Sequence, residues 1–513
     1  MPESIETAGK SLWQLIDERA SLTPDKRIAV DEQNRSWTYG EFRAWCERAA
    51  AGLAARGVGE GTNVSWILPS RIEAFVLAGA LARLGAVQNP ILPIYRHREI
   101  GFITRQTGCE LLVVPGTFRN VDYEKIAREA TEELDLEVMV ADPDLPEGDP
   151  ASLGPPASGE NPLRWVFYTS GTVADPKGAK HTDASIAAAN LGMQWSLRAD
   201  GRDRVAVVFP ITHVGGLVWM FNAMETGAEL LLVEIFSPEA SPEFLANHDV
   251  TVAAAGTVFW QAYLAAQRRQ PDRPLFPEVR VFAGGGAPKP PNIHYELMAE
   301  MGAPAIAGWG LTESPINTMM ELDDPDEKKA STEGKACPGV ALRAITVDGA
   351  LAAPGEEGEL QVSGAQVCLG YLDSSLDADG FTHDADGTRW FRTGDLGVID
   401  DDGFVTITGR LKDIIIRKGE NISAKEIEDL LFAHPKVVDV AVIGLPDPAS
   451  GERACAVVVS TEGEPFTFLE MTEHLRAADL TPQKLPEQLE LVDALPRNPS
   501  GKVLKRDLRK QFS

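Results

Sequence analysis

Short apolar runs alternate with longer amphipathic stretches over about the first 400 residues, and this alternation restricts the chain to a layered α/β fold. Residues 38–58 carry apolar side chains at about the helical period and end near a glycine, which predicts a helix. The run NVSWILPS that follows predicts a short buried strand, and residues 71–91 repeat the helix-then-strand order. Four later runs, each ended by Gly, Pro or an acid, predict further buried strands: residues 204–210, 228–234, 250–256 and 279–286.

The chain has 513 residues, which is too long for one compact core, so we expect more than one domain. Composition changes after about residue 400, where two strand-like runs flank a turn. Ser423 with Glu426 three residues later has the spacing of a capping box, which predicts that a helix begins there. We therefore expect a large N-terminal multi-sheet α/β domain, residues 1–411, and a small, mobile C-terminal α+β domain, residues 412–513.

The charge balance limits the partners of the chain. It has 48 basic and 76 acidic residues, and 48 − 76 gives a net charge of −28. Such a surface repels nucleic acid and anionic membranes, so an anionic ligand must be bound by local groups. We expect no signal peptide, and no apolar run approaches the roughly 20 residues of a membrane span. The five cysteines are scattered and lack CxxC spacing, which predicts a reduced, cytoplasmic setting.

The stretch WVFYTSGTVADPKG, residues 165–178, ends an apolar run in hydroxyls, glycines and a lysine. It lacks the spacing of the phosphate loop in P-loop NTPases. Thr169, Ser170 and Thr172, together with the backbone N–H groups of a glycine-containing turn, can still form a nest for an anion.

Two glycine-rich segments follow apolar runs. AGGGAPKP, residues 283–290, lets a flat or anionic ligand approach the backbone closely. GWGLTES, residues 308–314, offers the ring plane of Trp309 to a base and places Thr312 beside Glu313. A carboxylate near phosphates requires a cation between them, and Mg²⁺ is the usual one.

Three segments with polar residues lie further along the chain. Asp395, in the glycine-flanked turn FRTGDLG, can accept hydrogen bonds from a ribose diol. GRLKD supplies Arg410 and Lys412. PSGK places Lys502 just before a basic C-terminal helix, in a region with six basic residues and one acid between residues 497 and 510.

In this order the motifs resemble the acyl- and aryl-CoA synthetases of the ANL superfamily of adenylate-forming enzymes. The resemblance runs from SWTYGEF to PSGKVLKRDL, through SGT…PKG, GWGLTE, TGD, GRLKD, GENIS…EIE and PRNPSGK. NPILPIYRHREI and PKGAKHTD are similar to the cyclohexanecarboxylate-CoA ligase branch.

The resemblance implies roles for individual residues. ATP or AMP would be bound by Thr169, Ser170, Gly171, Thr172, Lys177, Gly285, Gly286, Ala287, Trp309, Gly310, Asp395 and Arg410. Thr312 would contact the α-phosphate, Glu313 the Mg²⁺, and Lys502 would serve adenylation. Lys412 matches the hinge of the small domain. Gly419 and Glu420 match the segment that lines the pantetheine channel, and the charges of Arg417 and Lys418 beside them suggest contacts with CoA phosphates. Val173 and Ala174 depart from the pattern, because the family usually has Thr and Gly there.

These roles imply ATP-dependent acid–thiol ligase chemistry. A carboxylate attacks the α-phosphorus of ATP, pyrophosphate leaves, and a CoA thiol then attacks the acyl-AMP and releases AMP. Lys502 must leave before the thiol enters, which a small domain rotating at Lys412 allows.

The acid pocket is expected to be apolar. His213 and Gly215 stand where the pocket of this family begins. Amino-acid adenylation domains carry an Asp near this point, where this chain has Ile211-Thr212-His213, which disfavours an amino acid. Further walls are expected from Val258, Phe259, Trp260, Gly308, Pro315 and Ile316. We therefore expect a short-chain, medium-chain or alicyclic acid as the substrate, and a role in fatty acid metabolism.

Two other functions remain open from the sequence. An acyl-AMP ligase that loads a carrier protein would keep the same motifs. An inactive nucleotide-binding sensor has Val173 and Ala174 in its favour, whereas the residues Glu313, Asp395, Arg410 and Lys502 argue against it. A homodimer is also open. The sequence gives ATP, CoA and a small carboxylic acid as the expected ligands.

Overall fold

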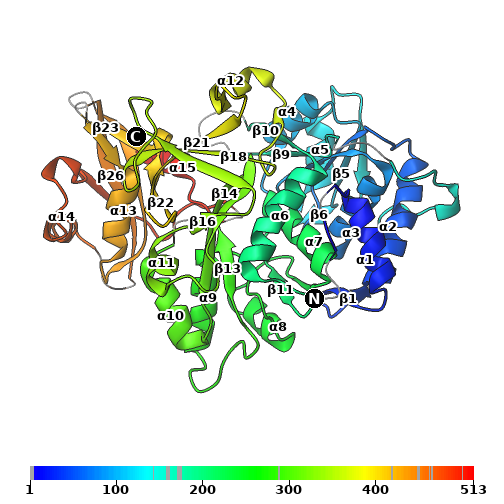
Figure 1. Ribbon diagram of the computed structural model, residues 1–513, viewed down its shortest axis with the longest axis horizontal. Coiled ribbons are helices and arrows are strands. Elements are labelled where there is room, and N and C mark those ends of the chain that lie inside the picture. The colour runs from blue at the N-terminus through cyan, green and yellow to red at the C-terminus, as the bar shows by residue number, and fades with distance from the viewer. Residues whose placement is uncertain are drawn as a thin grey trace.

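The computed structural model describes residues 5–7, 9–141, 144–157, 162–169, 176–286, 289–417, 420–447, 451–461, 463, 466–498 and 501–513. The strands before residue 411 build a large multi-sheet α/β part, and those after residue 413 build a separate, smaller sheet at the other end of the molecule (Figure 1). This arrangement confirms the predicted fold class. Within the described ranges, every helix is too short or too polar to cross a membrane.

The sheet beneath the candidate site has the strand order β19-β10-β9-β4-β3-β5-β8. Its middle strands are parallel and largely buried, because helices cover them. The strands are β3 (Asn63–Trp66), β4 (Val87–Pro90), β5 (Leu111–Val114), β8 (Glu137–Val140), β9 (Trp165–Tyr168), β10 (Gly178–His181) and β19 (Gly370–Tyr371). A short hairpin of β6 (Thr117–Phe118) and β7 (Val121–Asp122) follows β5.

A second sheet has the order β11-β12-β1-β2. Its strands are β1 (Arg27–Asp31), β2 (Ser36–Thr38), β11 (Arg204–Val207) and β12 (Glu229–Leu232). Helices pack between and around the two sheets: α1 (Leu12–Leu22), α2 (Tyr39–Ala54), α3 (Ile72–Leu84), α4 (His97–Thr107), α5 (Tyr123–Ala130), α6 (Asp183–Leu197) and α7 (Val214–Thr226). The helices predicted from residues 38–58 and 71–91 are therefore confirmed as α2 and α3.

Two further sheets lead towards the C-terminal part. The first has the order β13-β14-β15-β16, with β13 (Phe282–Gly285), β14 (Ala305–Leu311), β15 (Ser314–Met319) and β16 (Lys335–Ala336). The second contains β17 (Val340–Ile345), β18 (Glu357–Gly364), β20 (Phe381–His383), β21 (Arg389–Ile399) and β22 (Val405–Arg410). The helices of this region are α8 (Ser241–Asn247), α9 (Thr257–Arg268), α10 (Pro291–Met301), α11 (Asp326–Ser331) and α12 (Asp377–Gly380), with short 3₁₀ turns η1 (Pro150–Ser152) and η2 (Ser374–Leu376) elsewhere.

The C-terminal part is a sheet covered on both faces. Its strands are β23 (Ile414–Arg417), β24 (Glu420–Ser423), β25 (Val437–Asp447), β26 (Gly451–Ser460) and β27 (Gln488–Leu491); its helices are α13 (Ala424–Phe432), α14 (Phe468–Ala477) and α15 (Lys505–Phe512), with η4 (Pro482–Lys484). Alternate residues of β25 point to opposite faces. Val440 and Val442 pack in the core that contains α13 and α14, whereas Ala441 and Ile443 pack against Leu508 of α15.

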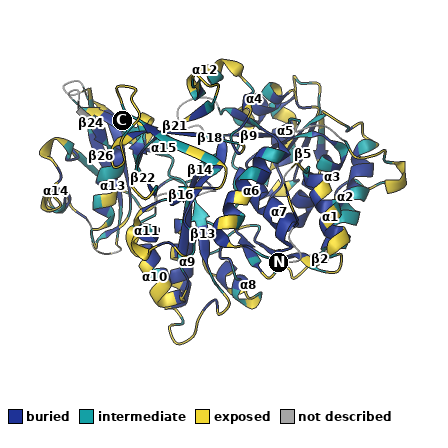
Figure 2. Cartoon of the chain, viewed as in Figure 1, coloured by how far each residue is buried: buried dark blue, intermediate teal, exposed yellow. Residues whose placement is uncertain are grey.

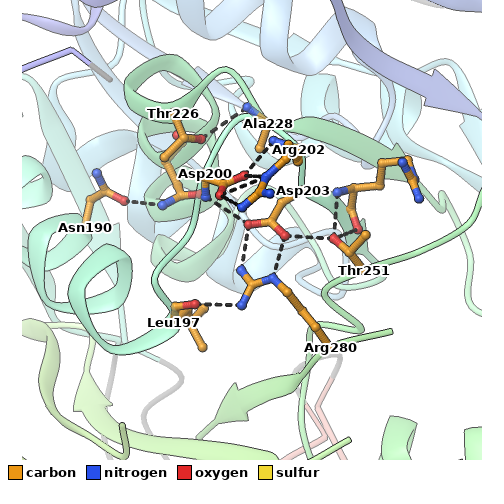
Figure 3. A network of polar contacts seen from close by, with 11 residues as sticks. Asn190, Leu197, Asp200, Arg202, Asp203, Thr226, Ala228, Thr251 and Arg280 are labelled. Carbon is orange, nitrogen blue, oxygen red and sulfur yellow. Dashed lines mark hydrogen bonds and ion pairs between the residues drawn. The ribbon is translucent and has the colours of Figure 1, made fainter. Parts of the chain in front are cut away.

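An ion pair between the partly exposed Arg280 and the buried Asp203 ties the segment that leads into the glycine-rich strand β13 to the second sheet (Figure 3). Arg280 donates from Nε and Nη2 to the two carboxylate oxygens of Asp203, at 2.7 and 2.6 Å. Its Nη1 donates to the carbonyl of Leu197 at the end of α6, and Thr251 donates to Asp203 at 2.9 Å. This fork fixes the strand that carries the candidate adenine-side glycines.

Two local predictions need correction. Residues 250–256 form isolated bridges instead of a strand: Val252 pairs with Val205 and Val281, and Ala255, at a φ of 141°, pairs with Gly284. Ser423 does cap α13 by accepting from the N–H of Glu426. The Glu426 carboxylate is ion-paired with Lys484 instead of completing the capping box.

Burial follows the pattern expected for layered sheets. The strands are largely buried, and exposed residues gather on outer helices such as α10 and α14 (Figure 2). All five cysteines, each within the described ranges, are buried and free. Burial raises the pKa of the Cys337 and Cys368 thiols to about 12, so they behave as core side chains.

Candidate active site

A cavity of about 720 Å³ lies between the large N-terminal part and the C-terminal part. Its walls come from the start of α7, the ends of β13 and β14, the turn into β15 and the middle of β21. The linking turn η3 (Leu411–Asp413) adds Lys412, and the C-terminal part adds Asn498 and Lys502. Thr169 and Lys502, which lie at opposite ends of the series of motifs, therefore line one cavity.

The GWGLTE motif is the hairpin between β14 and β15, and Thr312 and Glu313 form its two-residue turn. A Cβ on Gly310 would lie 1.8 Å from the carbonyl oxygen of Pro315, and Gly308 is similarly crowded by β15. The two glycines are needed because the strands pair too closely for any side chain.

Three groups hold the Thr312–Glu313 turn. His181 Nε2 donates to the carbonyl of Thr312 at 2.8 Å. Burial lowers the pKa of His181 to about 4, so the imidazole is neutral. The hydroxyl of Tyr371 donates to Oε1 of Glu313 at 2.7 Å, and the backbone N–H of Cys368 donates to the Glu313 carbonyl at 2.8 Å. The Glu313 side chain is thus oriented towards the cavity that it lines. Tyr371 was missed in the sequence because its contact is made across the sheet by β19.

The phosphate loop is described only at its two ends. The backbone N–H of Thr169 donates to the carbonyl of Lys177 at 3.0 Å, and both residues line the cavity. Lys177 Nζ lies 5.1 Å from the centre of the Tyr371 ring, within the range of a cation–π contact. Ser170, Gly171, Thr172, Val173 and Ala174 lie outside the described residues.

Asp395 joins the predicted adenine and ribose residues. It is buried in β21 directly opposite Arg410 of β22. Its Oδ2 accepts from Nε1 of Trp309 at 2.8 Å, and its Oδ1 lies 2.6 Å from Nε of Arg410. All three side chains line the cavity. Arg410 holds the Asp395 carboxylate, and the hydrogen bond to that carboxylate holds the Trp309 ring at the cavity wall.

The two predicted glycines at the end of β13 differ in what they require. A Cβ on Gly285 would lie 2.3 Å from the carbonyl oxygen of Gly308, so close strand pairing explains this glycine. Gly286 has a φ of +80° and no neighbouring atom within 4 Å of a Cβ, so here the left-handed backbone favours glycine. Ala287 lies outside the described residues.

Lys502 reaches the cavity from the C-terminal part. Burial, together with Arg410 and Lys412, lowers the pKa of Lys502 to about 7, while Asp395 opposes this shift. The pKa of His213 is lowered to about 4 by burial and, less strongly, by the charge of Lys502. The two side chains therefore interact across the boundary between the two parts. Burial and Arg410 also lower the pKa of Lys412.

A group of apolar side chains lines the cavity together with His213, and we call this part of the wall the apolar lobe. His213 caps α7, where its Nδ1 accepts from the N–H of Gly215 at 3.1 Å. The predicted wall residues Phe259, Pro315 and Ile316 line this cavity, and Gly308 also lines it. The structure adds further walls that the sequence did not single out: Met193, Phe209, Val214, Val218, Trp219 and Met319.

Two predicted acyl-pocket residues lie elsewhere. Val258 lines an adjacent, smaller cavity of about 220 Å³, and a Cβ on Gly501 would lie 3.5 Å from its Cγ2. It therefore faces the loop of Lys502. Trp260 is fully buried in the core, where its ring lies under Gly284. Successive helical residues point about 100° apart, so of these three neighbours in α9 only Phe259 reaches the large cavity.

The expected CoA-binding segment is only partly described. Arg417 ends β23, where it donates to the carbonyl of Gln483 at 2.5 Å and is ion-paired with Glu487 at 2.5 Å. Its guanidinium is thus bound within the C-terminal part. Lys418 and Gly419 lie outside the described residues, and Glu420 is described only as the first residue of β24.

Glu313 suits a magnesium ion. The hydroxyl of Tyr371 occupies its Oε1, which leaves carboxylate lone pairs facing the cavity. Mg²⁺ sites in nucleotide enzymes use one or two carboxylates and complete the shell with phosphate oxygens and water. The donor set on the protein therefore fits this ion.

The sequence matches two family models. Residues 16–372 match the AMP-binding enzyme family, and residues 426–502 match the AMP-binding enzyme C-terminal domain. The chain is 30% identical to the medium-chain fatty-acid–CoA ligase of Escherichia coli, over 98% of this chain and 89% of that protein. It is 32% identical to the sulfoacetate–CoA ligase of Cupriavidus necator, over 98% and 97%.

Solved structures agree with this assignment. ATP-bound MatB from Rhodopseudomonas palustris matches with a TM-score of 0.87 and 28% identity, over 98% of this chain and 99% of that one. The apo form of MatB matches with a TM-score of 0.76 and the same identity, over 98% of both chains. The chain therefore belongs to the AMP-binding enzyme family, in the acyl-CoA synthetase branch of the ANL superfamily, and is an ATP-dependent acid–thiol ligase.

Proposed function

We propose that this enzyme joins an apolar short-chain, medium-chain or alicyclic carboxylic acid to CoA through an acyl-AMP intermediate. One observation carries the proposal: Lys502 of the C-terminal part lies in the same cavity as Glu313, Asp395 and an apolar lobe. A cation, a metal-binding carboxylate and a ribose-binding carboxylate are the groups that this reaction requires.

The first half-reaction brings two anions together. A carboxylate oxygen attacks the α-phosphorus of ATP, and the bond to pyrophosphate breaks. Lys502, when protonated, would lie between the two anions and offset their repulsion. In the free site the pKa of Lys502 is about 7, so the lysine is only partly protonated at neutral pH. Bound anions raise that pKa, so substrate binding protonates the lysine.

Glu313 and Lys177 would both act at the phosphates of ATP. Mg²⁺, held by Glu313, would supply positive charge to the phosphate oxygens. Tyr371 touches both side chains, through a hydrogen bond to Glu313 and a ring contact with Lys177. Asp395 and Arg410 would hold the ribose, and Trp309 would provide the plane for adenine.

The lobe beyond His213 supports an apolar acid. Its side chains are aromatic or aliphatic, and His213 is neutral because burial lowers its pKa to about 4. Trp219 and Phe259 are bulky aromatic residues of the cavity wall, and such walls favour short, medium or cyclic acids over long chains.

The second half-reaction needs a different arrangement. The CoA thiol attacks the carbonyl carbon of acyl-AMP, and the bond to AMP breaks. Lys412 lies in η3, where the chain passes from β22 into β23, so we propose it as the hinge about which the C-terminal part rotates. The higher TM-score to ATP-bound than to apo MatB supports assigning the present arrangement to the first half-reaction. Rotation would release Lys502 and bring the segment from Arg417 to Glu420 to the cavity.

ATP–pyrophosphate exchange over a panel of carboxylic acids tests the first half-reaction. We expect acid-dependent exchange that EDTA abolishes and that is fastest with an apolar acid. Exchange that is unaffected by EDTA would exclude Glu313 as a metal ligand. Exchange with amino acids alone would exclude the proposed substrate class.

The acyl acceptor needs its own test, because the relatives of this chain include a protein that is not named as a CoA ligase. The salicyl-AMP ligase / salicyl-S-ArCP synthetase of Mycobacterium tuberculosis is 30% identical over 98% of this chain and 91% of that protein. Addition of CoA should release AMP and thioester. Product formed only with a carrier protein would instead favour that second function. Arg417→Ala and Lys418→Ala should raise the KM for CoA and leave that for the acid unchanged; an unchanged CoA KM would exclude both from CoA binding.

A further inference from the structure

We propose that Arg497 is a positioning residue for the first half-reaction, because it holds the loop that carries Lys502 in the shape that reaches the cavity. The inference rests on the proposed role of Lys502 in adenylation.

The loop around Lys502 closes on itself through Asn498. The Asn498 N–H donates to the carbonyl of Lys502 at 2.9 Å, and the Lys502 N–H donates to Oδ1 of Asn498 at 2.9 Å. The Gly501 N–H donates to the Asn498 carbonyl at 2.9 Å, with Gly501 at a φ of +83°. Arg497 pairs with Val503 as an antiparallel bridge at the base of this loop.

The Arg497 guanidinium fastens this loop to β25, the strand at one end of the order β24-β23-β26-β25 in the C-terminal sheet. Its Nη1 donates to the carbonyl of Gly501, and its Nη2 donates to Oδ2 of Asp439 at 2.6 Å. Asp439 belongs to β25, and the Arg497 and Asp439 side chains are only 25% and 20% exposed. One side chain thus connects the residue next to Lys502 with a rigid strand, in charge-assisted contacts of fixed geometry.

The same loop is one of the segments that contact the N-terminal part. Gly501 lies against Val258 of α9, and Arg497, Lys502 and Asp439 line the small cavity beside that contact. The following helix α15 is held separately, through the ion pairs of Lys505 with Glu428 and Arg509 with Asp413. Loss of the Arg497 guanidinium should therefore move the loop while α15 keeps its place.

This geometry separates the two half-reactions. Lys502 has to reach the attacking carboxylate during adenylation, and a misplacement of about 1 Å can cost roughly 100-fold in rate. In thioester formation Lys502 has left the cavity, so the shape of its loop should not matter. A residue that only stabilised the C-terminal part would affect both steps alike.

The test compares variants in the two half-reactions separately. Arg497→Met keeps the length of the side chain but removes every donor, Arg497→Lys keeps the charge without the fork, and Asp439→Asn weakens one of the two contacts. Lys436→Met, which breaks an ion pair with Glu470 in the same part of the chain, is the matched control. Adenylation is measured by ATP–pyrophosphate exchange with the acid that supports the fastest exchange in the wild type. Thioester formation is measured from the corresponding chemically synthesised acyl-AMP and CoA.

We expect Arg497→Met to lower exchange about 100-fold and thioester formation less than about twofold, with Arg497→Lys and Asp439→Asn between it and the control. Equal loss in both steps, or no loss of exchange, would overturn the proposal. If Arg497→Met does not fold, Asp439→Asn decides: a loss confined to exchange supports the proposal, and any other result overturns it. Lys502→Ala is run in parallel. If Lys502→Ala keeps full exchange, the proposed role of Lys502 in adenylation is wrong. If Lys502→Ala loses exchange but the Arg497 variants keep it, only the positioning role of Arg497 is wrong.

Discussion

Binding of ATP to the free enzyme at pH 8 should take up nearly one proton, and Lys502 should be the group that takes it. In the free site the pKa of Lys502 is about 7, because burial and the charges of Arg410 and Lys412 disfavour the ammonium form. At pH 8 about 0.1 of the lysine is then protonated. The polyphosphate of ATP adds negative charge beside it and raises its pKa towards the ordinary value, so roughly 0.8 to 0.9 proton is taken up on binding.

The sign of the effect follows from the same pKa. Below pH 7 the free lysine is already protonated, so uptake by this group should fall to about 0.1 proton at pH 6. Uptake should therefore grow as the pH rises from 6 to 8. Above the pKa of the bound state, uptake should fall again.

Isothermal titration calorimetry in buffers of different ionisation enthalpy measures this uptake directly. ATP is titrated without acid or CoA, so that no reaction follows. Lys502→Met cannot take up the proton and leaves the contribution of ATP itself, while Lys510→Met, at an exposed site on α15, should behave as the wild type. Equal uptake by the wild type and Lys502→Met at pH 8, or a difference that is larger at pH 6, would refute the reasoning.

Three further substitutions test separate parts of the structure. Tyr371→Phe removes the hydrogen bond to Glu313 and keeps the ring, so the Mg²⁺ concentration for half-maximal exchange should rise about tenfold; an unchanged midpoint would contradict the positioning role. Trp219→Ala enlarges the apolar lobe, so the ratio of kcat/KM for octanoate over butyrate should rise about tenfold, and a constant ratio would place the acid elsewhere. Arg280→Met leaves Asp203 buried without its partner, which should lower the free energy of unfolding by about 3 kcal/mol in urea titrations; an unchanged urea midpoint would count against the importance of this pair.

Local sequence patterns predicted much of the fold. The helical periods of residues 38–58 and 71–91 correspond to α2 and α3, and the apolar runs 204–210, 228–234 and 279–286 contain β11, β12 and β13. Residues 250–256 have the composition of a strand, but they form only isolated bridges with their neighbours. That pairing depends on how two sheets meet and leaves no trace in local composition.

The candidate site could be predicted only where its residues form motifs. Thr312 and Glu313 occupy a hairpin turn whose closely paired strands require the glycines at positions 308 and 310. Tyr371 and Trp219 were missed because each reaches the cavity through tertiary contacts, from β19 and α7, and neither stands in a distinctive local pattern. Val258 was misplaced because one step along a helix turns a side chain about 100°.

The hinge at Lys412 and the boundary between residues 411 and 412 stay predictions of the sequence. The change from β22 to β23 at η3 supports them, since the two strands belong to different sheets. Crosslinking cysteines introduced at Gly501 and Val258 would hold the two parts in the present arrangement. The crosslinked enzyme should perform exchange but form no thioester, and thioester formation at the normal rate would exclude the rotation.

The fate of oxygen atoms in the carboxylic acid tests the central claim most directly. The enzyme is supplied with an acid whose carboxylate carries ¹⁸O in both positions, together with ATP and CoA, and the released AMP is analysed by mass spectrometry. Attack of the carboxylate on the α-phosphorus, followed by attack of the thiol on the carbonyl, transfers one labelled oxygen to each AMP. We expect AMP with one ¹⁸O and thioester with the other. Unlabelled AMP, or label in pyrophosphate, would contradict a mechanism through acyl-AMP.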